Sequence, residues 1–256
     1  SAGGARAKAV IAFNPETGEV KSGQVEAPAG FSHWLIKFDG VTDTQFGASV
    51  GYGRVEMAYY LMAQAAGIEM NECRLLEENG RAHFMTKRFD RTDDGGKIHM
   101  QSLCGIRHFD FNQVGVYSYE QVFETMRMLR LSYPEAEQLF IRMVFNVLAR
   151  NCDDHTKNFA FLMDQSGKWS LSPGYDICHA YRPGSMWVSA QSLMVNGKRE
   201  GISDVDFLEV ARKMNIKNPG ERIEMVRAAV KRWNEFAEAV KVDSALRDSI
   251  QTTLLV

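Results

Sequence analysis

The chain has few cysteines, no long apolar run and almost no net charge, and each absence excludes a class of protein. Its four cysteines, Cys73, Cys104, Cys152 and Cys178, form no Cys-x-x-Cys pair, which argues against a disulfide framework or a zinc site. No apolar stretch reaches membrane-spanning length, and no signal peptide is visible. A net charge of −2 argues against charge-driven binding of nucleic acid. These absences together predict a cytoplasmic protein without a membrane segment.

The remaining composition is that of an ordinary globular protein. Of 256 residues, 45% are hydrophobic and 24% are charged, and no repeat or low-complexity segment interrupts them. A chain of this length can bury a large core and can form one large domain or two lobes.

The first third of the chain predicts a small α+β unit. One helix is expected over 55–66, with Gly67 as its C-cap. Asn79–Gly80 is a strong hairpin signal between two of the expected strands. The strands are short and separated by turn residues, and they cover residues 9–13, 20–26, 33–38, 73–76 and 82–87.

From about residue 100 helices dominate. Capping-box spacing at Ser118 and Ser132 predicts helices over 119–130 and 134–150. A further helix is expected from 218 to about 240, and Asp243 caps a terminal one. The polar segment 91–96 separates the two parts. We therefore predict a two-lobed α+β fold, with an N-lobe over 1–92, a helical C-lobe over 93–256 and a nucleotide cleft between them.

The most informative segment is a polar loop, Asn151-Cys-Asp-Asp-His-Thr-Lys-Asn158, between an apolar helix and an apolar strand. Phosphoryl transfer needs an acid that accepts the proton of the attacking hydroxyl, and an amide oxygen and a second acid that hold magnesium. Asp153 and Asn158 have the four-residue separation that kinases use for the base and the metal-binding amide, and Asp176 follows as a second acid. By pattern alone, a catalytic loop and an ordinary solvated turn are equally good interpretations.

Asp153–Asn158, together with Leu171-Ser-Pro-Gly-Tyr-Asp-Ile177, resembles the HipA family of serine/threonine kinase toxins. Members show Asp-Gly/Asp-His-x-Lys-Asn followed by Leu-Thr/Ser-Pro-x-Tyr-Asp. The sequence departs from the pattern at Arg6, where glutamine is usual. Members carry a further small N-terminal subdomain, and this chain starts inside the glycine-rich loop, so we expect upstream sequence to be missing. Other blocks match in the family's order, namely Ser1–Lys8, His33–Lys37, Lys87–Arg91 and His99–Leu103.

The resemblance implies roles for residues of the polar loop and the chain start. Asp153 would be the catalytic base and Lys157 an electrostatic stabiliser, while Asn158 and Asp176 would hold Mg²⁺. The glycine-rich segment Ser1–Lys8, with Lys8 at its end, would cover the phosphates of ATP, and Ser1 would be autophosphorylated. Without the resemblance, such a segment is more often a flexible tail.

The resemblance also implies nucleotide contacts from the first third of the chain. Lys37 would reach the α/β-phosphates, oriented by Glu56, and Lys87 and Phe89 would border the adenine. The alternatives are a lysine that extends from an exposed strand face and a phenylalanine that only packs between lobes. Glutamate often stands at the position of Lys87 in the family, so a contact there would come from the backbone.

Two histidines near these acids, His155 and His179, are expected to be structural, because histidine-metal chemistry would need a further soft ligand at suitable spacing.

The function implied is that of an ATP- and Mg²⁺-dependent serine/threonine kinase, the toxin of a toxin–antitoxin pair. It would phosphorylate itself and a translation-related protein such as an aminoacyl-tRNA synthetase. Its antitoxin would be a small HipB-like helix-turn-helix protein, through which it would associate indirectly with operator DNA. A small-molecule phosphotransferase of the aminoglycoside-kinase type and a non-catalytic, antitoxin-binding module are the alternatives. The intact set of Asp153, Asn158 and Asp176 argues against the second of them.

Overall fold

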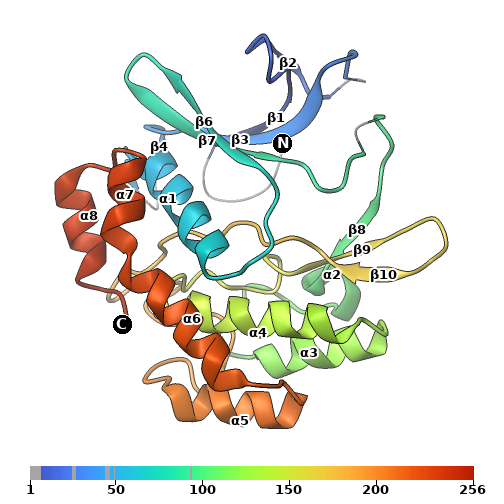
Figure 1. The fold of residues 1–256 in the computed structure, drawn as a ribbon, viewed down its shortest axis with the longest axis vertical. Helices are drawn as coiled ribbons and strands as arrows, with labels where there is room; N and C mark the ends of the chain where they lie inside the picture. Colours follow the sequence, from blue (N-terminus) through green and yellow to red (C-terminus); the bar gives the residue numbers. More distant parts are fainter. Residues whose placement is uncertain (1–6, 25–26, 44–46, 49, 93) are drawn as a thin grey trace.

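The computed structural model describes residues 7–24, 27–43, 47–48, 50–92 and 94–256, with the side chains of 42–48 left out (Figure 1). A β-sheet with one helix beneath it forms one end of the molecule, and helices form the other (Figure 1). This is the α+β arrangement that the order of predicted elements indicates.

The main sheet is antiparallel and has the strand order β2-β1-β3-β7-β6. Its register places Lys8, the first residue of β1, directly opposite Lys37, the last residue of β3. Both lysines belong to the predicted phosphate site. A separate two-stranded hairpin joins β4 (Thr42–Asp43) to β5 (Gly47–Ala48). The five strands of the main sheet are β1 (Lys8–Phe13), β2 (Val20–Ser22), β3 (Ser32–Lys37), β6 (Cys73–Glu78) and β7 (Arg81–Lys87).

Turn chemistry decides where these strands end. Asn79 and Gly80 both have positive φ, 46° and 77°, as the tight turn of a β-hairpin requires, and the predicted hairpin is confirmed. The predicted strand over 20–26 is too long, because β2 ends at Ser22 and Gly23 and Gln24 lie in a turn; residues 25–26 lie outside the described part of the chain. A side chain at Gly23 would meet the backbone of β1 at 2.7 Å, so the chain turns there in close contact with its neighbour.

Helix α1 (Tyr52–Ala65) packs directly against β7. A Cβ at Gly53 would lie 1.9 Å from the carbonyl oxygen of Ala82, so only glycine allows the helix to lie this close. The helix ends where glycine was expected to end it, since Gly67 follows the C-cap with φ 80°. Its buried face includes Val55 and Tyr59, which belong to the same core as the C-terminal helices.

The remaining helices follow the predicted caps, with two differences. Ser118 and Ser132 both form capping boxes. The helix expected over 218–240 is two helices, which meet at Arg232, and neither α2 (Leu103–Arg107) nor α5 (Asp204–Met214) was predicted. A three-stranded sheet of order β10-β9-β8 accompanies them. The bounds are β8 (His99–Ser102), α2 (Leu103–Arg107), α3 (Tyr119–Met128), α4 (Tyr133–Leu148), β9 (Ala160–Met163), β10 (Trp169–Leu171), α5 (Asp204–Met214), α6 (Pro219–Lys231), α7 (Trp233–Ala239) and α8 (Ser244–Gln251).

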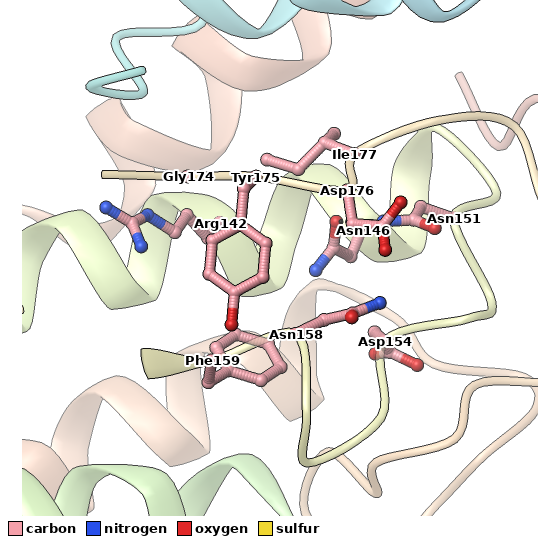
Figure 2. A pocket seen from close by; sticks show the side chains of 10 residues that line it. All are labelled: Arg142, Asn146, Asn151, Asp154, Asn158, Phe159, Gly174, Tyr175, Asp176 and Ile177. Atoms are coloured by element: carbon pink, nitrogen blue, oxygen red, sulfur yellow. Dashed lines mark hydrogen bonds between the residues drawn. The ribbon is translucent and has the colours of Figure 1, made fainter. Parts of the chain in front are cut away.

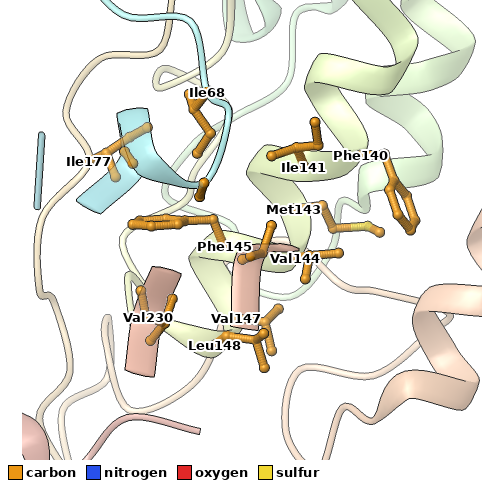
Figure 3. Packing of buried hydrophobic residues seen from close by; sticks show 14 of the residues in the cluster. Ile68, Phe140, Ile141, Met143, Val144, Phe145, Val147, Leu148, Ile177 and Val230 are labelled. Atoms are coloured by element: carbon orange, nitrogen blue, oxygen red, sulfur yellow. The ribbon is translucent and has the colours of Figure 1, made fainter. Parts of the chain in front are cut away.

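Helix α4 forms the centre of the largest core, and every residue from Leu139 to Leu148 is buried. Each large apolar side chain that is fully buried contributes about 1.5–3 kcal/mol to stability. The polar loop that follows α4 therefore starts from a rigidly held helix end. Figure 3 shows α4 side chains in one cluster with Ile68, Ile177 and Val230 of other segments. The labelled residues of α4 are Phe140, Ile141, Met143, Val144, Phe145, Val147 and Leu148.

The division into 1–92 and 93–256 stays a prediction. The sheet lies within the first range and the helices α2–α8 within the second, but the core of α1 is continuous with that of α6 and α7.

Candidate active site

The polar loop 151–158 is tied to its surroundings on both sides. Cys152 N donates to the carbonyl oxygen of Ala180 at 3.1 Å. Cys104 N, from α2, donates to the carbonyl oxygen of Thr156 at 3.0 Å. The two bonds hold the backbone of the loop, one near its start and one near its end.

The two adjacent acids of the loop have opposite environments. The Asp153 side chain is 50% exposed, with one oxygen 3.7 Å from His155 Nε2. Asp154 is completely buried, and its carboxylate accepts hydrogen bonds from Tyr119, Gln191 and Ser192. Burial raises the pKa of Asp154 to about 6, although these hydrogen bonds act in the opposite direction. Only Asp153 presents a carboxylate to solvent at this point of the loop.

Asn158 closes the loop onto Asp153. Its Nδ2 donates to the carbonyl oxygen of Asp153 at 2.7 Å, and its own N–H donates to the carbonyl oxygen of His155 at 2.9 Å. Because the amide nitrogen is held by the backbone, the orientation of the Oδ1 oxygen is fixed. Figure 2 shows Asn158 and Asp176 at the same small pocket, which is lined by Arg142, Asn146, Asn151, Asp154, Asn158, Phe159, Gly174, Tyr175, Asp176 and Ile177.

A buried ion-pair cluster connects this pocket to the main sheet. Lys37, at the end of β3, donates from its ammonium to both Glu56 of α1 and Asp176. Lys37 is 7% exposed, the Glu56 side chain is 3% exposed and the Asp176 side chain is 36% exposed. Three residues that are distant in sequence thus meet at one point, and all three are residues that the sequence pointed to.

The pKa values of Lys37 and Asp176 are shifted in opposite directions. Burial acts to lower the pKa of Lys37, but the carboxylates of Asp176 and Glu56 outweigh it and raise that pKa above its usual range. Burial likewise acts to raise the pKa of Asp176, and Lys37, with a contribution from Lys8, outweighs it and holds that pKa well below its usual range. Both groups are therefore charged near neutral pH. Asp176 also has a left-handed backbone, with φ 56°.

The segment predicted to border adenine lies beside the pocket. The N–H of Lys87 donates to Glu72 at 2.8 Å and its carbonyl oxygen accepts from Asn71 at 3.1 Å, so its polar backbone groups already have protein partners. The ring of Phe89 lies 5.5 Å from that of Tyr175, centroid to centroid. Phe89 thus contacts the residue next to Asp176, and its contact with adenine stays a prediction.

The other predicted residues are placed as follows. The ammonium of Lys157 lies over the ring of Phe111, 3.2 Å from its centroid, and its stabilising role stays a prediction.

The Nε2 atom of His179 is hydrogen-bonded to the Thr253 hydroxyl at 2.9 Å, and burial lowers the pKa of His179 to about 4, which suits the structural role expected for it. Ser1 and the glycines of the glycine-rich segment lie outside the described residues; only Ala7 and Lys8 of that region are described.

Several residues of the site were missed in the sequence. The hydroxyl of Tyr175 donates to the carbonyl oxygen of Lys157 at 2.6 Å and so links the polar loop to the Asp176 segment. Arg142 is buried in α4 and donates to the carbonyl oxygen of Ser172 at 2.8 Å. Burial lowers the pKa of Arg142 to about 10. An arginine inside the largely apolar run 139–148 was a sequence signal that could have indicated it.

Comparison with known proteins identifies the family. Residues 1–240 match the family model of the HipA-like C-terminal domain. The chain belongs to this family. In the described part of this HipA-like chain, no helix is long and apolar enough to cross a membrane.

Two curated relatives of this HipA-like chain come from Sinorhizobium fredii (strain NBRC 101917 / NGR234). "Putative kinase Y4mE" is 26% identical over 57% of this chain and 36% of its own length. "Putative kinase Y4dM" is 23% identical over 95% of this chain and 61% of its own length. The chain therefore spans about a third and about three fifths of these relatives.

Solved structures share the fold. HipA of Shewanella oneidensis MR-1, solved with HipB and its operator DNA, superposes with a TM-score of 0.70 at 15% identity, over 100% of this chain and 63% of that chain. The Helicobacter pylori proinflammatory kinase CtkA gives a TM-score of 0.53 at 13% identity, over 89% of both chains. The kinase-like α+β fold expected from the sequence is confirmed.

Proposed function

We propose that this HipA-like chain transfers the γ-phosphoryl group of ATP to a serine or threonine hydroxyl of a protein. The observation that carries the proposal is the contact of Lys37 with both Glu56 and Asp176 beside the loop that presents Asp153 and Asn158. A phosphate-binding lysine, its orienting glutamate, two oxygen ligands and a base are the parts that kinase chemistry uses.

Asp153 is the better base of the two adjacent acids. Its carboxylate is half exposed, whereas both oxygens of Asp154 accept hydrogen bonds inside the protein. A base must come within hydrogen-bond distance of the hydroxyl proton that it removes, and a fully buried carboxylate cannot. Asp153 would accept that proton as the hydroxyl oxygen bonds to the γ-phosphorus, the bond from that phosphorus to the bridging oxygen breaks and ADP leaves.

Asn158 and Asp176 fit a magnesium ion. Mg²⁺ prefers oxygen ligands and is commonly held by one or two protein groups together with substrate phosphates. Asn158 offers an amide oxygen whose orientation is fixed, and Asp176 offers a carboxylate that stays ionised because its pKa is lowered. When bound, the ion would neutralise charge on the phosphate oxygens during transfer.

Lys37 would contact the phosphates. Its ammonium has three N–H donors, so the bonds to Glu56 and Asp176 leave one donor for a phosphate oxygen. Lys8 lies opposite it in the sheet and lowers the pKa of Asp176, so it adds a second positive charge near the same point. We propose the same phosphate-covering role for Ser1–Lys8 as in the family pattern, with Ser1 as an autophosphorylation site.

We further propose that the chain is the toxin of a toxin–antitoxin pair, with a helix-turn-helix antitoxin as partner. The support is the likeness to a HipA that was solved with HipB and operator DNA. A net charge of −2 suits an indirect association with DNA through the partner. A translation-related substrate, such as an aminoacyl-tRNA synthetase, is proposed from the family resemblance.

The test is incubation of the purified protein with γ-labelled ATP, Mg²⁺ and a cell lysate, with Asp153→Asn as the matched control. We expect phosphoserine or phosphothreonine on a lysate protein and on Ser1, detected by mass spectrometry, with wild type only. Label in small molecules alone would replace the proposal with a small-molecule phosphotransferase. ATP binding without label in any fraction would leave a non-catalytic binding module.

A further inference from the structure

A buried polar network lies directly beneath the polar loop, with Asp154 at its centre. Asp154 is 0% exposed. Its Oδ2 accepts from the Tyr119 hydroxyl at 2.7 Å and from Gln191 Nε2 at 3.0 Å, and its Oδ1 accepts from the Ser192 N–H at 2.7 Å. The three donors come from α3 and from the segment 190–195, so one side chain of the loop binds two other parts of the fold.

The same segment also binds the loop backbone. Gln191 Nε2 donates to the carbonyl oxygen of Asn151 at 3.1 Å, and the Ser192 hydroxyl donates to that of Cys152 at 2.9 Å. The Cys152 thiol donates to Gln191 Oε1 at 3.0 Å. Three hydrogen bonds to Gln191 and Ser192 therefore hold Asn151 and Cys152, the two residues just before Asp153.

The donors of the network have fixed directions. Asn146 of α4 donates from Nδ2 to the Tyr119 hydroxyl oxygen at 2.9 Å, so the single proton of that hydroxyl is directed to Asp154. Asn151 Nδ2 donates to Asn146 Oδ1 at 3.0 Å, so the hydrogen-bond network connects back to the polar loop. A network whose members are all bonded holds a unique geometry, whereas one missing member leaves a costly buried group.

Asp154 adjoins the proposed base through one peptide bond. The planar peptide means that the position of Asp154 restricts the backbone of Asp153. The carbonyl oxygen of Asp153 in turn accepts the Nδ2 of Asn158, so the same backbone orients the proposed metal ligand. Burial of the Asp154 carboxylate carries a large desolvation cost, and it occurs at the position that restricts both Asp153 and Asn158.

We propose that Asp154 is a positioning residue: its carboxylate fastens the polar loop to Tyr119 and the segment 190–195, and so sets the orientation of Asp153 and Asn158. This inference rests on the proposed function for its effect on turnover. Asp154 does not touch the substrate, because it is buried and its oxygens are occupied by three donors.

The test compares Asp154→Asn with Asp206→Asn. Asparagine has one acceptor oxygen, so its NH₂ group must face at least one of the three donors of the network. Asp206 is a matched control, because it is 1% exposed and hydrogen-bonded by Ser203 and Lys198 at the start of α5, at the far end of the molecule from the main sheet (Figure 1). We expect Asp154→Asn to lower kcat about ten- to hundredfold and to raise the Mg²⁺ concentration needed for half-maximal rate, because Asp153 and Asn158 both lose their fixed orientation. Asp206→Asn should lower the melting temperature but keep kcat.

A second measurement does not depend on turnover. Amide hydrogen exchange should become faster in residues 151–158 and 190–195 of Asp154→Asn, and stay at the wild-type rate in 151–158 of Asp206→Asn. Unchanged exchange in Asp154→Asn, or an equal kcat loss in Asp206→Asn, would overturn the inference. If wild type transferred no phosphoryl group, the proposed function would fail, and the exchange rates would still decide the role of Asp154. If Asp154→Asn did not fold, Tyr119→Phe, which removes one donor, must give the same changes in smaller size.

Discussion

Replacement of Lys37 by methionine tests the ion-pair cluster, because it keeps the length of the side chain and removes the charge. Lys37 is 7% exposed, and its ammonium contacts the carboxylates of Glu56 and Asp176. In the variant, the Glu56 side chain, which is 3% exposed, loses its lysine partner, while the more exposed Asp176 can be solvated.

The expected cost follows from this difference in burial. Removal of one partner of a buried ion pair costs about 3–5 kcal/mol, and most of it should come from Glu56 because surface-exposed pairs contribute only about 0–1 kcal/mol. For a chain of this size, that loss corresponds to a melting temperature lower by roughly 6–20 °C. The double variant Lys37→Met/Glu56→Gln removes the buried charge and should recover most of the loss.

Nucleotide affinity separates a phosphate contact from a structural role. A hydrogen bond to a charged group contributes about 1.5–3 kcal/mol, so both Lys37 variants should bind ATP roughly 10- to 150-fold more weakly. Adenosine, which has no phosphates, should bind as it does to wild type. Paired calorimetric titrations of ATP and adenosine, with thermal melts to confirm folding, make the comparison.

Two outcomes would refute this reasoning. Equal losses for ATP and adenosine in the double variant would mean that Lys37 supports the fold or the adenine pocket instead of the phosphates. No loss for either ligand would remove Lys37 from the site. A melting temperature unchanged in Lys37→Met would show that the buried pair contributes little.

Three further changes give distinct results. Asp153→Asn should abolish phosphoryl transfer from labelled ATP and keep ATP affinity in calorimetry; near-native turnover would contradict its role as base. Asp176→Asn should raise the Mg²⁺ concentration needed for nucleotide binding, and an unchanged magnesium titration would exclude it as a ligand. Burial lowers the pKa of His179 to about 4 in the folded protein, whereas the usual value of 6.5 applies in the unfolded chain. As pH falls below 6.5, the unfolded chain therefore takes up a proton before the folded protein does. Wild type should therefore lose about 3 kcal/mol of stability between pH 6.5 and 4 that His179→Asn keeps, as measured by urea unfolding; parallel curves would refute this.

Local chemistry explains what could be predicted from sequence. The hairpin at Asn79–Gly80 and the caps at Ser118 and Ser132 depend on residues a few positions apart, and the structure has all three. Gly67 ends α1 for the same reason. The spacing from Asp153 to Asn158 is also local, since the bond that joins them closes within the loop.

Elements that depend on packing were less predictable. The short β2 follows from the close contact of Gly23 with the backbone of β1, and the break between α6 and α7 at Arg232 was not predicted. The helix α5 was not predicted; its capping box has Asp206 three residues after Ser203, where the usual pattern has glutamate or glutamine.

The sequence by itself determined which residue types form the site, because the acids, the amide and their spacing are written in one short loop and one later segment. Only the tertiary structure decided how these residues are arranged. Asp153 and Asp154 are chemically identical neighbours, and burial against Tyr119 and Ser192 makes one of them a fixed part of the interior and leaves the other exposed. The contact of Lys37 with Asp176 joins residues 139 positions apart, and no local pattern specifies it, because it exists only when the sheet and the helices pack together.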